Sequence, residues 1–350
     1  KFGRPVNKNN FELSFYHVND VHAHLDEFRS SGSSCTDVTK GVWASCSHSN
    51  QDLTFHQAAL VDMLVQGVVG KQRPTKKHSL FLNAGDEFQG TLFFTLYEGE
   101  AISTVLNQLG FDAFTIGNHE FDKGDDVLAA FLKNLTFPAI SANIHTDNKK
   151  LAKQLVPYKL FNTGKYRGMD LAVVAVTTET TKYISQPGKG TTFEDPVAAV
   201  KRTVKAIKRL HPTINKIVAL THIGYEGDIR LAKETTDISL IIGGHSHTLL
   251  GAPELHPCSQ CQADNASGNM TGAAGSYPTI VNNAKGEEVF VVTSYRWGEY
   301  LGYIDLEFDR RGRIVSYEGA PIHLTNATAE DPKVKARVKN YAKGFDVFAK

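Results

Sequence analysis

Five times along the chain, an apolar run ends directly in side chains that can bind a metal ion. The segment Thr115–Asp122 places an Asn amide, an imidazole and two carboxylates behind such a run, and Gly117 permits the backbone to turn there. The same arrangement recurs in four other segments: Phe15–His22, Leu80–Asp86, Ile217–His222 and Leu240–His247. One polar strand end is usually a cap or an ordinary loop residue, but five are hard to explain by structure alone.

The apolar runs alternate with amphipathic stretches, which is typical of a layered α/β fold. Buried strands are expected at 11–19, 79–84, 112–116, 138–142, 171–177, 216–221 and 238–242, and helices at 53–66, 98–109, 125–134 and 196–210. A Gly/Ser/Asn-rich loop follows residue 248. Antiparallel strands are then expected at 288–293, 300–308 and 313–318, with Gly312 in a hairpin turn, and a charged helix at 331–348 with little to bury it.

Size and charge limit the possible functions. The 350 residues are 41% hydrophobic, enough for one large domain or two ordinary ones. The formal net charge is +1 without a basic block, so we expect a small-molecule substrate and no nucleic acid. No apolar run approaches the roughly 20 residues of a membrane helix, and no signal-like segment is visible at Lys1. We therefore expect no transmembrane segment in a chain that is soluble or already processed, and the sequence leaves the oligomeric state open.

The cysteines and glycosylation motifs favour a secreted protein. Four cysteines allow three pairings, and their spacing favours Cys35 with Cys46 and Cys258 with Cys261 as structural disulfides. A redox or zinc-binding role for Cys258 and Cys261 is not favoured, because the sequence has no second Cys-x-x-Cys pair. Acceptor motifs for N-glycosylation begin at Asn134, Asn265, Asn269 and Asn326.

Because ligands bind where the carboxyl ends of strands meet, the five strand ends should converge on one crevice. They bring Asp20, His22, Asp86, Asn118, His222, His245 and His247, with His119 and Asp122 close by. Mixed carboxylate, imidazole and amide sets suit zinc, manganese or iron. Seven ligands are too many for one ion, but they divide into two sets of four if one carboxylate bridges.

These blocks resemble those of the calcineurin-like metallophosphoesterases. Longer segments are similar to the 5′-nucleotidase/apyrase family within it: Asn19–His24, Asn83–Thr91, Gly117–Asp122, Phe137–Asn143, Tyr300–Ile304 and Glu330–Pro332. The resemblance covers nearly the whole chain. It implies an α-β-β-α sandwich with mixed sheets.

The resemblance also implies roles for the residues. Asp20, His22, Asp86 and His247 would hold one divalent ion, and Asp86, Asn118, His222 and His245 a second one. Zinc is expected, with manganese, cobalt, calcium or magnesium as alternatives. His119 and Asp122 would form a catalytic dyad, and Asn118 and His119 would contact the substrate, a nucleotide such as AMP, ADP or ATP. The Asp three residues after the His could hold the imidazole oriented and protonated.

Two departures from the family pattern stand out. Residues 43–70 do not match the family's Gly-Gly-containing helix start. Family members typically also carry a C-terminal nucleotide-specificity domain, which we expect to be absent from the 350 residues given. We therefore expect a catalytic domain at 1–330 and a connecting helix at 331–350, with little discrimination between nucleobases. The alternatives are a non-catalytic secreted binding protein on this scaffold, or a UDP-sugar hydrolase or cyclic-nucleotide phosphodiesterase.

Three weaker signals remain. The segment Gly188–Thr192 looks faintly like a phosphate loop but lacks its first Gly and its Ser or Thr after Lys, so we expect a surface turn. His24 could lie behind the metal ligands. Residues 296–298 are interpreted as an edge of the core and not as a substrate clamp.

Overall fold

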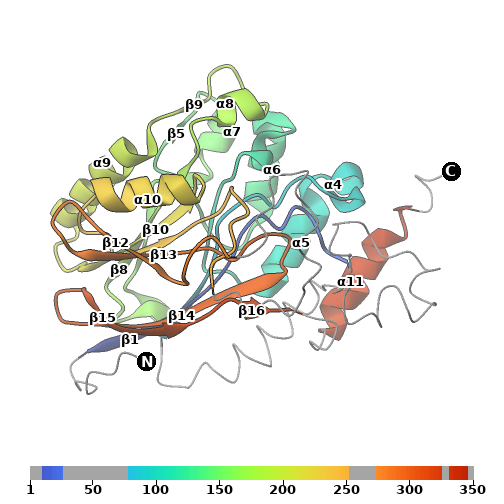
Figure 1. Cartoon of the computed structure of the whole chain (residues 1–350). Coiled ribbons are helices and arrows are strands. Elements are labelled where there is room, and N and C mark those ends of the chain that lie inside the picture. Colours follow the sequence, from blue (N-terminus) through green and yellow to red (C-terminus); the bar gives the residue numbers. More distant parts are fainter. Residues whose placement is uncertain (1–9, 27–77, 252–272, 325–330, 346–350) are drawn as a thin grey trace.

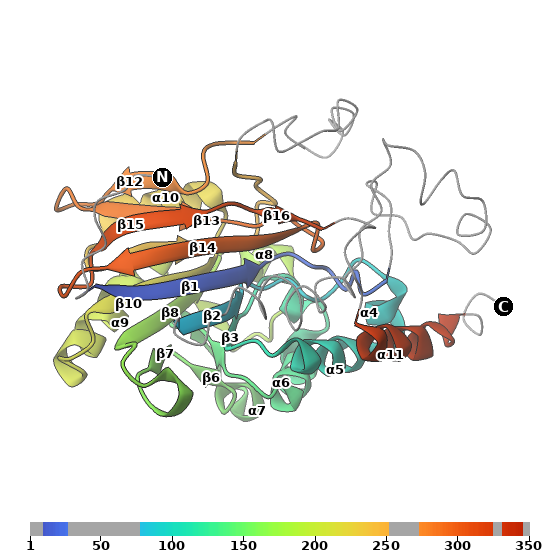
Figure 2. The same cartoon turned by 90° about the horizontal axis from the view of Figure 1, so that it is seen from below.

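Two β-sheets lie face to face, and helices cover the outer side of each one (Figures 1 and 2). The computed structural model describes residues 10–26, 78–251, 273–324 and 331–345. The predicted helix at 53–66, the segment 43–70 and all four cysteines lie outside these residues, as do Asn265, Asn269 and Asn326.

The first sheet has eight strands and is mixed. Strands β1 to β4 and β6 run parallel, whereas β14 is antiparallel to both β1 and β15. In spatial order the strands are β15 (Ile314–Gly319), β14 (Tyr300–Phe308), β1 (Phe11–Val18), β2 (His78–Asn83), β3 (Ala113–Thr115), β4 (Ala139–Ile140) and β6 (Leu155–Val156), with β16 (Ile322–His323) beside β14.

The second sheet has six strands and is parallel at its centre, with an antiparallel strand at each edge. Its order is β12 (Thr279–Asn282), β13 (Glu288–Val292), β11 (Leu240–Ile242), β10 (Lys216–His222), β8 (Leu171–Thr177) and β7 (Tyr158–Phe161). A separate pair consists of β5 (Ile144–His145) and β9 (Thr192–Phe193).

The helices connect these strands. They are α4 (Leu92–Tyr97), α5 (Gly99–Leu109), α6 (Gly124–Asn134), α7 (Lys149–Ala152), α8 (Thr181–Ile184), α9 (Pro196–Leu210), α10 (Tyr225–Glu234) and α11 (Pro332–Ala342), with 3₁₀ turns η2 (His119–Phe121) and η3 (Gly164–Tyr166). None of the helices in the described ranges is both long and apolar enough to cross a membrane.

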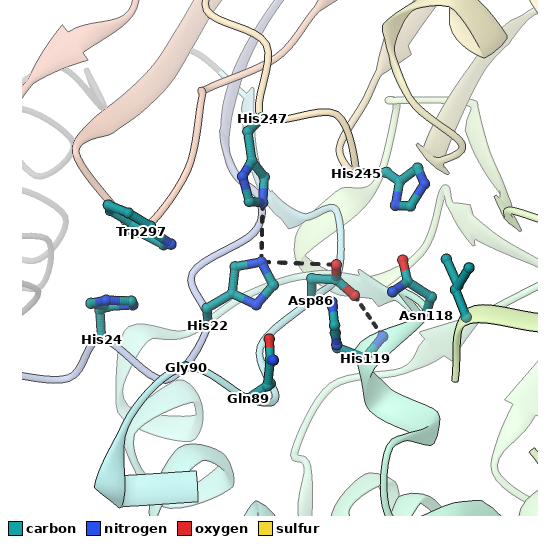
Figure 3. A pocket seen from close by; sticks show the side chains of 11 residues that line it. His22, His24, Asp86, Gln89, Gly90, Asn118, His119, His245, His247 and Trp297 are labelled. Atoms are coloured by element: carbon teal, nitrogen blue, oxygen red, sulfur yellow. Dashed lines mark hydrogen bonds and ion pairs between the residues drawn. The ribbon is translucent and has the colours of Figure 1, made fainter. Parts of the chain in front are cut away.

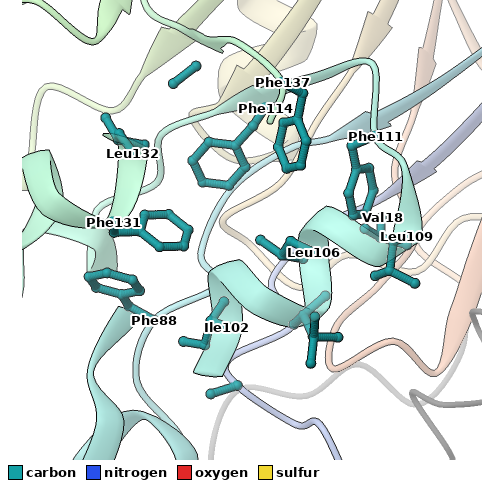
Figure 4. Packing of buried hydrophobic residues seen from close by; sticks show 14 of the residues in the cluster. Val18, Phe88, Ile102, Leu106, Leu109, Phe111, Phe114, Phe131, Leu132 and Phe137 are labelled. Atoms are coloured by element: carbon teal, nitrogen blue, oxygen red, sulfur yellow. The ribbon is translucent and has the colours of Figure 1, made fainter. Parts of the chain in front are cut away.

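Three hydrophobic clusters hold the layers together, and they follow from the alternation of side chains along the strands. In β1, Phe15 points into the cluster between the two sheets, whereas Tyr16 joins the cluster under α5 and α6. Figure 4 shows this second cluster, with Phe114 of β3 packed between the two helices. A third cluster joins the second sheet to α9 and α10. The layer order is therefore helix, sheet, sheet, helix, which confirms the predicted α/β sandwich.

Two expectations about the C-terminal part are wrong in detail. Strand β13 was expected to lie in an antiparallel arrangement with the strands after it. Instead it pairs in parallel with β11, because it belongs to the second sheet. Helix α11 was expected to have little to bury it, but one of its faces packs against the domain. Val334 and Val338 are buried, and the Tyr341 ring packs on Tyr97. The hairpin turn at Gly312 is present, with a φ of 78°.

Candidate active site

The carboxyl ends of β1, β2 and β3 in the first sheet and of β10 and β11 in the second meet at one pocket of about 460 Å³ (Figure 3). The prediction of a shared crevice is confirmed, although it spans two sheets. The pocket is lined by His22, His24, Asp86, Gln89, Gly90, Asn118, His119, Ile184, His245, His247 and Trp297.

Three groups of side chains lie close enough together to hold a metal ion, because the candidate ligand atoms within each group are all within 4.8 Å of one another. Two of these groups consist only of predicted metal ligands. In the first group, His22 Nε2 lies 3.1 Å from His247 Nε2, which lies 3.4 Å from Asp20 Oδ1. The second group consists of Asp86, His222 and His245, and Asp86 Oδ2 lies 3.0 Å from His222 Nε2.

Asp86 connects the two groups. Its Oδ2 atom also lies 4.0 Å from His22 Nε2, and its Oδ1 atom accepts a hydrogen bond of 2.9 Å from the backbone N–H of His119. His22, Asp86 and His119 themselves form a third close group. Asp86 therefore lies within 4.0 Å of imidazoles from both metal-binding groups. Asp20 does so as well, since its Oδ1 atom lies 3.4 Å from His247 Nε2 and 3.9 Å from His222 Nε2.

The chemistry of the donors fits divalent metal ions. The Nδ1 atoms of His22 and His222 face the carbonyl oxygens of Phe88 (3.1 Å) and Ala84 (2.7 Å), so each ring donates there and leaves Nε2 as a free ligand atom. His222 Nε2 and Asn118 Oδ1 are buried without a hydrogen-bond partner among the described residues. Asp86 Oδ2 lies 3.0 Å from His222 Nε2 as its ion-pair partner. Such orphaned atoms are expected where an ion binds.

Burial and charge act in opposite directions on the titration of the cluster in the absence of metal. Burial opposes a charge on His222, but the carboxylates of Asp86 and Asp20 outweigh it and raise its pKa. Burial also lowers the pKa of His22 and of His245 to about 4. Neutral imidazoles are the form that binds a metal, so these two rings are ready to act as ligands.

His119 and Asp122 form a hydrogen-bonded pair at the edge of the same pocket. His119 Nδ1 lies 2.7 Å from Asp122 Oδ2. Since a carboxylate only accepts hydrogen bonds, Nδ1 carries the proton. Partial burial opposes the charged imidazole, but the hydrogen bond to Asp122 and the charge of Asp86 raise the pKa of His119.

Glu120 joins the two loops that carry Asp86 and His119. Its carboxylate is fully buried and accepts backbone hydrogen bonds from Gly117 (2.6 Å), Asp86 (3.0 Å), Glu87 (2.7 Å) and Phe88 (3.1 Å). The loops after β2 and β3 are therefore held in register by one side chain.

Several candidate ligands have backbones in the left-handed region, which is uncommon outside glycine. The φ angles are 53° for Asp20, 52° for His22, 58° for Asp86, 86° for His245 and 47° for His247. Residues held in such conformations concentrate at functional sites, because the surrounding structure must offset a cost of about 1–3 kcal/mol each.

Gly117 is required for a different reason than the predicted turn. Its φ is not in the left-handed region, but a Cβ atom there would lie 2.1 Å from Asp86 Oδ1. The position therefore needs glycine because the Asp86 carboxylate occupies the space of a side chain.

All nine residues predicted for the site are brought together by the structure. Six of them line the pocket: His22, Asp86, Asn118, His119, His245 and His247. Asp20 and His222 are fully buried behind them, and Asp122 lies behind His119.

The sequence missed other parts of the wall. Trp297 lines the pocket and stacks on His24, their ring centres 5.0 Å apart, whereas residues 296–298 had been interpreted as an edge of the core. Arg296 and Gly298 are buried, as that interpretation expects, whereas Trp297 is only partly buried. His24 lies in the pocket wall beside the candidate ligands. Ile184 and Gln89 also line the pocket. Gln89 lies in the family-like segment Asn83–Thr91, whereas no local motif marks Ile184.

The fold and the site define an α/β protein with a candidate metal centre between the carboxyl ends of two sheets. Residues 13–249 match the family described as calcineurin-like phosphoesterase, and the chain belongs to this family.

Among known proteins, the chain is similar to 5′-nucleotidases. It is 33% identical to the 5′-nucleotidase of Bos taurus over 345 residues, which is 97% of this chain and 54% of that protein. The structure of a 5′-nucleotidase precursor from Thermus thermophilus matches with a TM-score of 0.78 at 33% identity, covering 96% of this chain and 59% of the other. The NAD nucleotidase of Haemophilus influenzae matches with a TM-score of 0.76 at 26% identity, covering 97% and 61%. The chain thus spans about half the length of the curated relatives it matches.

Proposed function

We propose that this chain is the catalytic part of a two-metal phosphohydrolase that releases inorganic phosphate from nucleotides. The observation that carries the proposal is the arrangement of two metal-binding groups, joined at Asp86, with the His119–Asp122 pair at the same pocket. The similarity to 5′-nucleotidases supports nucleotides as the substrate class.

Each residue has a role in this proposal. Asp20, His22, Asp86 and His247 would hold one ion, and Asp86, Asn118, His222 and His245 the other. When bound, the ions supply charge neutralisation for the phosphate and activation of the attacking water. Zinc fits the mixed nitrogen and oxygen donors best.

His119 acts on the substrate in the same scheme. Its Nδ1 atom is occupied by Asp122 at 2.7 Å, which fixes the ring and leaves the Nε2–H to donate. A protonated imidazole there stabilises negative charge that develops on the phosphoryl oxygens or on the leaving oxygen. Asn118 contacts the phosphate beside it.

A substrate panel tests the proposal. Phosphate release is measured from AMP, ADP, ATP and an aryl phosphate, with and without added zinc or manganese, and a phosphodiester and a UDP-sugar are included to separate related activities. We expect release from at least one nucleotide that depends on metal and is lost in Asp86→Asn. If all substrates stay intact after metal loading, the chain is a binding protein on this scaffold and the proposal fails.

We also propose that the protein is secreted and that residues 331–350 connect the catalytic domain to a nucleotide-specificity domain. Asn134 is exposed at the end of α6, where a glycan can attach, and the half-length match to the relatives agrees with the second assignment. Expression through a eukaryotic secretory pathway, followed by a glycosidase shift assay on the wild type and Asn134→Gln, tests secretion and glycosylation.

A further inference from the structure

We infer that Ser185 is a positioning residue for the His119–Asp122 pair, an inference that rests on the proposed function. Ser185 Oγ donates a hydrogen bond of 2.7 Å to Asp122 Oδ1, while the other carboxylate oxygen, Oδ2, lies 2.7 Å from His119 Nδ1. Each oxygen of Asp122 therefore has its own partner, and the two partners fix the rotation of the carboxylate from opposite sides.

Ser185 comes from a segment far away in the sequence. It follows helix α8 and lies 63 positions after Asp122. Ile184, the residue directly before it, lines the pocket. The segment that builds this part of the pocket wall thus also reaches behind the catalytic pair.

The segment around Ser185 is held in place without the Ser185 hydroxyl. On its N-terminal side, the backbone N–H of Thr178 donates to the carbonyl oxygen of His222 at 2.8 Å. On its C-terminal side, Asp125 accepts from the backbone N–H of Gly188 at 2.8 Å and from Thr191 Oγ1 at 2.5 Å. Since these anchors do not involve Ser185, removing its hydroxyl should leave the segment in place and affect Asp122.

The predicted surface turn at 188–192 has a structural role in this arrangement. Gly188 and Thr191 bind Asp125, which lies in the first turn of α6, and Asp122 lies just before that helix. The turn therefore fastens the Ser185 segment to the same helix start that carries the catalytic pair.

Loss of the Ser185 hydroxyl should impair the chemical step more than substrate binding. With Oδ1 released, the Asp122 carboxylate can rotate, and the His119 ring that it orients loses its fixed direction toward the reacting phosphate. Orientation of this kind contributes to the transition state, whereas most of the substrate's binding contacts lie elsewhere in the pocket.

The test compares Ser185→Ala and Ser185→Thr with Thr191→Val as a matched control. Thr191→Val removes a hydroxyl that binds Asp125 and not the catalytic pair. The bonds from Thr178 to His222 and from Gly188 to Asp125 remain in this variant and still hold the segment. For the best nucleotide in the substrate panel, Ser185→Ala should lower kcat by about tenfold with a nearly unchanged KM, a fraction of the roughly 10²–10⁴-fold that a positioned acid or base contributes. Ser185→Thr should restore most of kcat, and Thr191→Val should keep it.

A second readout does not depend on turnover. The His119 Nδ1 proton, bonded to a carboxylate, should give a downfield imidazole resonance in the proton NMR spectrum of the protein, assigned by its loss in His119→Ala. Ser185→Ala should shift or broaden this resonance, and Thr191→Val should leave it in place. An unchanged resonance in Ser185→Ala, or the same change in Thr191→Val, would overturn the positioning role. An inactive wild type would refute the proposed function, while the resonance would still decide the role of Ser185.

Discussion

Replacing Gly117 by alanine should disable the site while the fold survives. The new Cβ atom would lie 2.1 Å from Asp86 Oδ1 and 2.6 Å from the Asp86 backbone nitrogen. Ordinary contact begins at 3.4 Å, so the carboxylate or its loop must move by about 1.3 Å. Neither loop moves easily, because the Glu120 carboxylate binds the backbone of both.

The size of the effect follows from what Asp86 contacts. A shift of this size breaks the 2.9 Å hydrogen bond from His119 N and changes the 3.0 Å approach to His222. A misplacement of about 1 Å at a reacting centre costs on the order of 100-fold in rate. We therefore expect kcat/KM to fall by roughly 100-fold or more, with a loss of about 1–3 kcal/mol in the free energy of unfolding from overpacking.

The assay measures kcat/KM at saturating metal together with thermal unfolding. The control is Gly110→Ala, at a left-handed helix end with a φ of 73° and no described atom within 4 Å of the added Cβ. That variant should lose about 1 kcal/mol of stability and keep its activity. If Gly117→Ala retains activity close to the wild type, the packing of Asp86 against Gly117 does not position the carboxylate and the reasoning is refuted.

Three further predictions concern metal, pH and packing. Asp86→Asn should lose both bound metal and turnover, whereas His119→Ala should keep its metal and lose turnover. Elemental analysis measures the metal content of both variants. A metal-free His119→Ala variant would show that His119 is a metal ligand. Burial lowers the pKa of His17 to about 3 from 6.5, so protonation below pH 6.5 favours the unfolded state and stability falls as the pH drops toward 3. Between pH 6 and pH 4, the free energy of unfolding measured in urea titrations should fall by about 2.5 kcal/mol more in the wild type than in His17→Gln. Parallel pH dependences of the two proteins would contradict this. In Gly302→Ala the added Cβ would lie 2.1 Å from His17 Nε2, so the melting temperature should drop while kcat/KM is kept; an unchanged melting temperature would show that the ring can move aside.

Much of the fold was predictable because both faces of each sheet are covered. Strand β8 is a continuous apolar run and begins and ends where its sequence predicts. Strand β14 also has its predicted bounds, although it is antiparallel to its neighbours and its buried side chains largely alternate. Helix α9 also has its predicted bounds, since Asp195 caps its start and Pro196 occupies the first position. The candidate ligands were visible for the same reason, because each follows a run that could be located.

The parts that the sequence did not reveal depend on contacts between distant segments. Nothing local indicates that β13 belongs to the second sheet, because its partner β11 is chosen by the packing of the layers. The place of Trp297 in the pocket wall depends on the backbone hydrogen bond of 2.7 Å from its N–H to the carbonyl oxygen of Asp20, far away in the sequence. The short helix α4 has Thr91 at its N-cap, but the Thr91 hydroxyl donates to the carbonyl oxygen of Ala23 at 2.6 Å and makes no cap hydrogen bond.

The site is supported from both sheets before any ion binds. Asp20 on the first sheet accepts the backbone N–H of His245 from the second at 2.9 Å, and His222 of the second sheet binds the carbonyl oxygen of Ala84 in the first at 2.7 Å. These contacts hold the left-handed residues in conformations that the loops alone would not adopt. Because each cross-sheet contact joins a candidate ligand to the opposite sheet, the ligand positions depend on how the two sheets pack. The apolar cluster between the sheets therefore determines the spacing of the ligands as well as the stability of the fold.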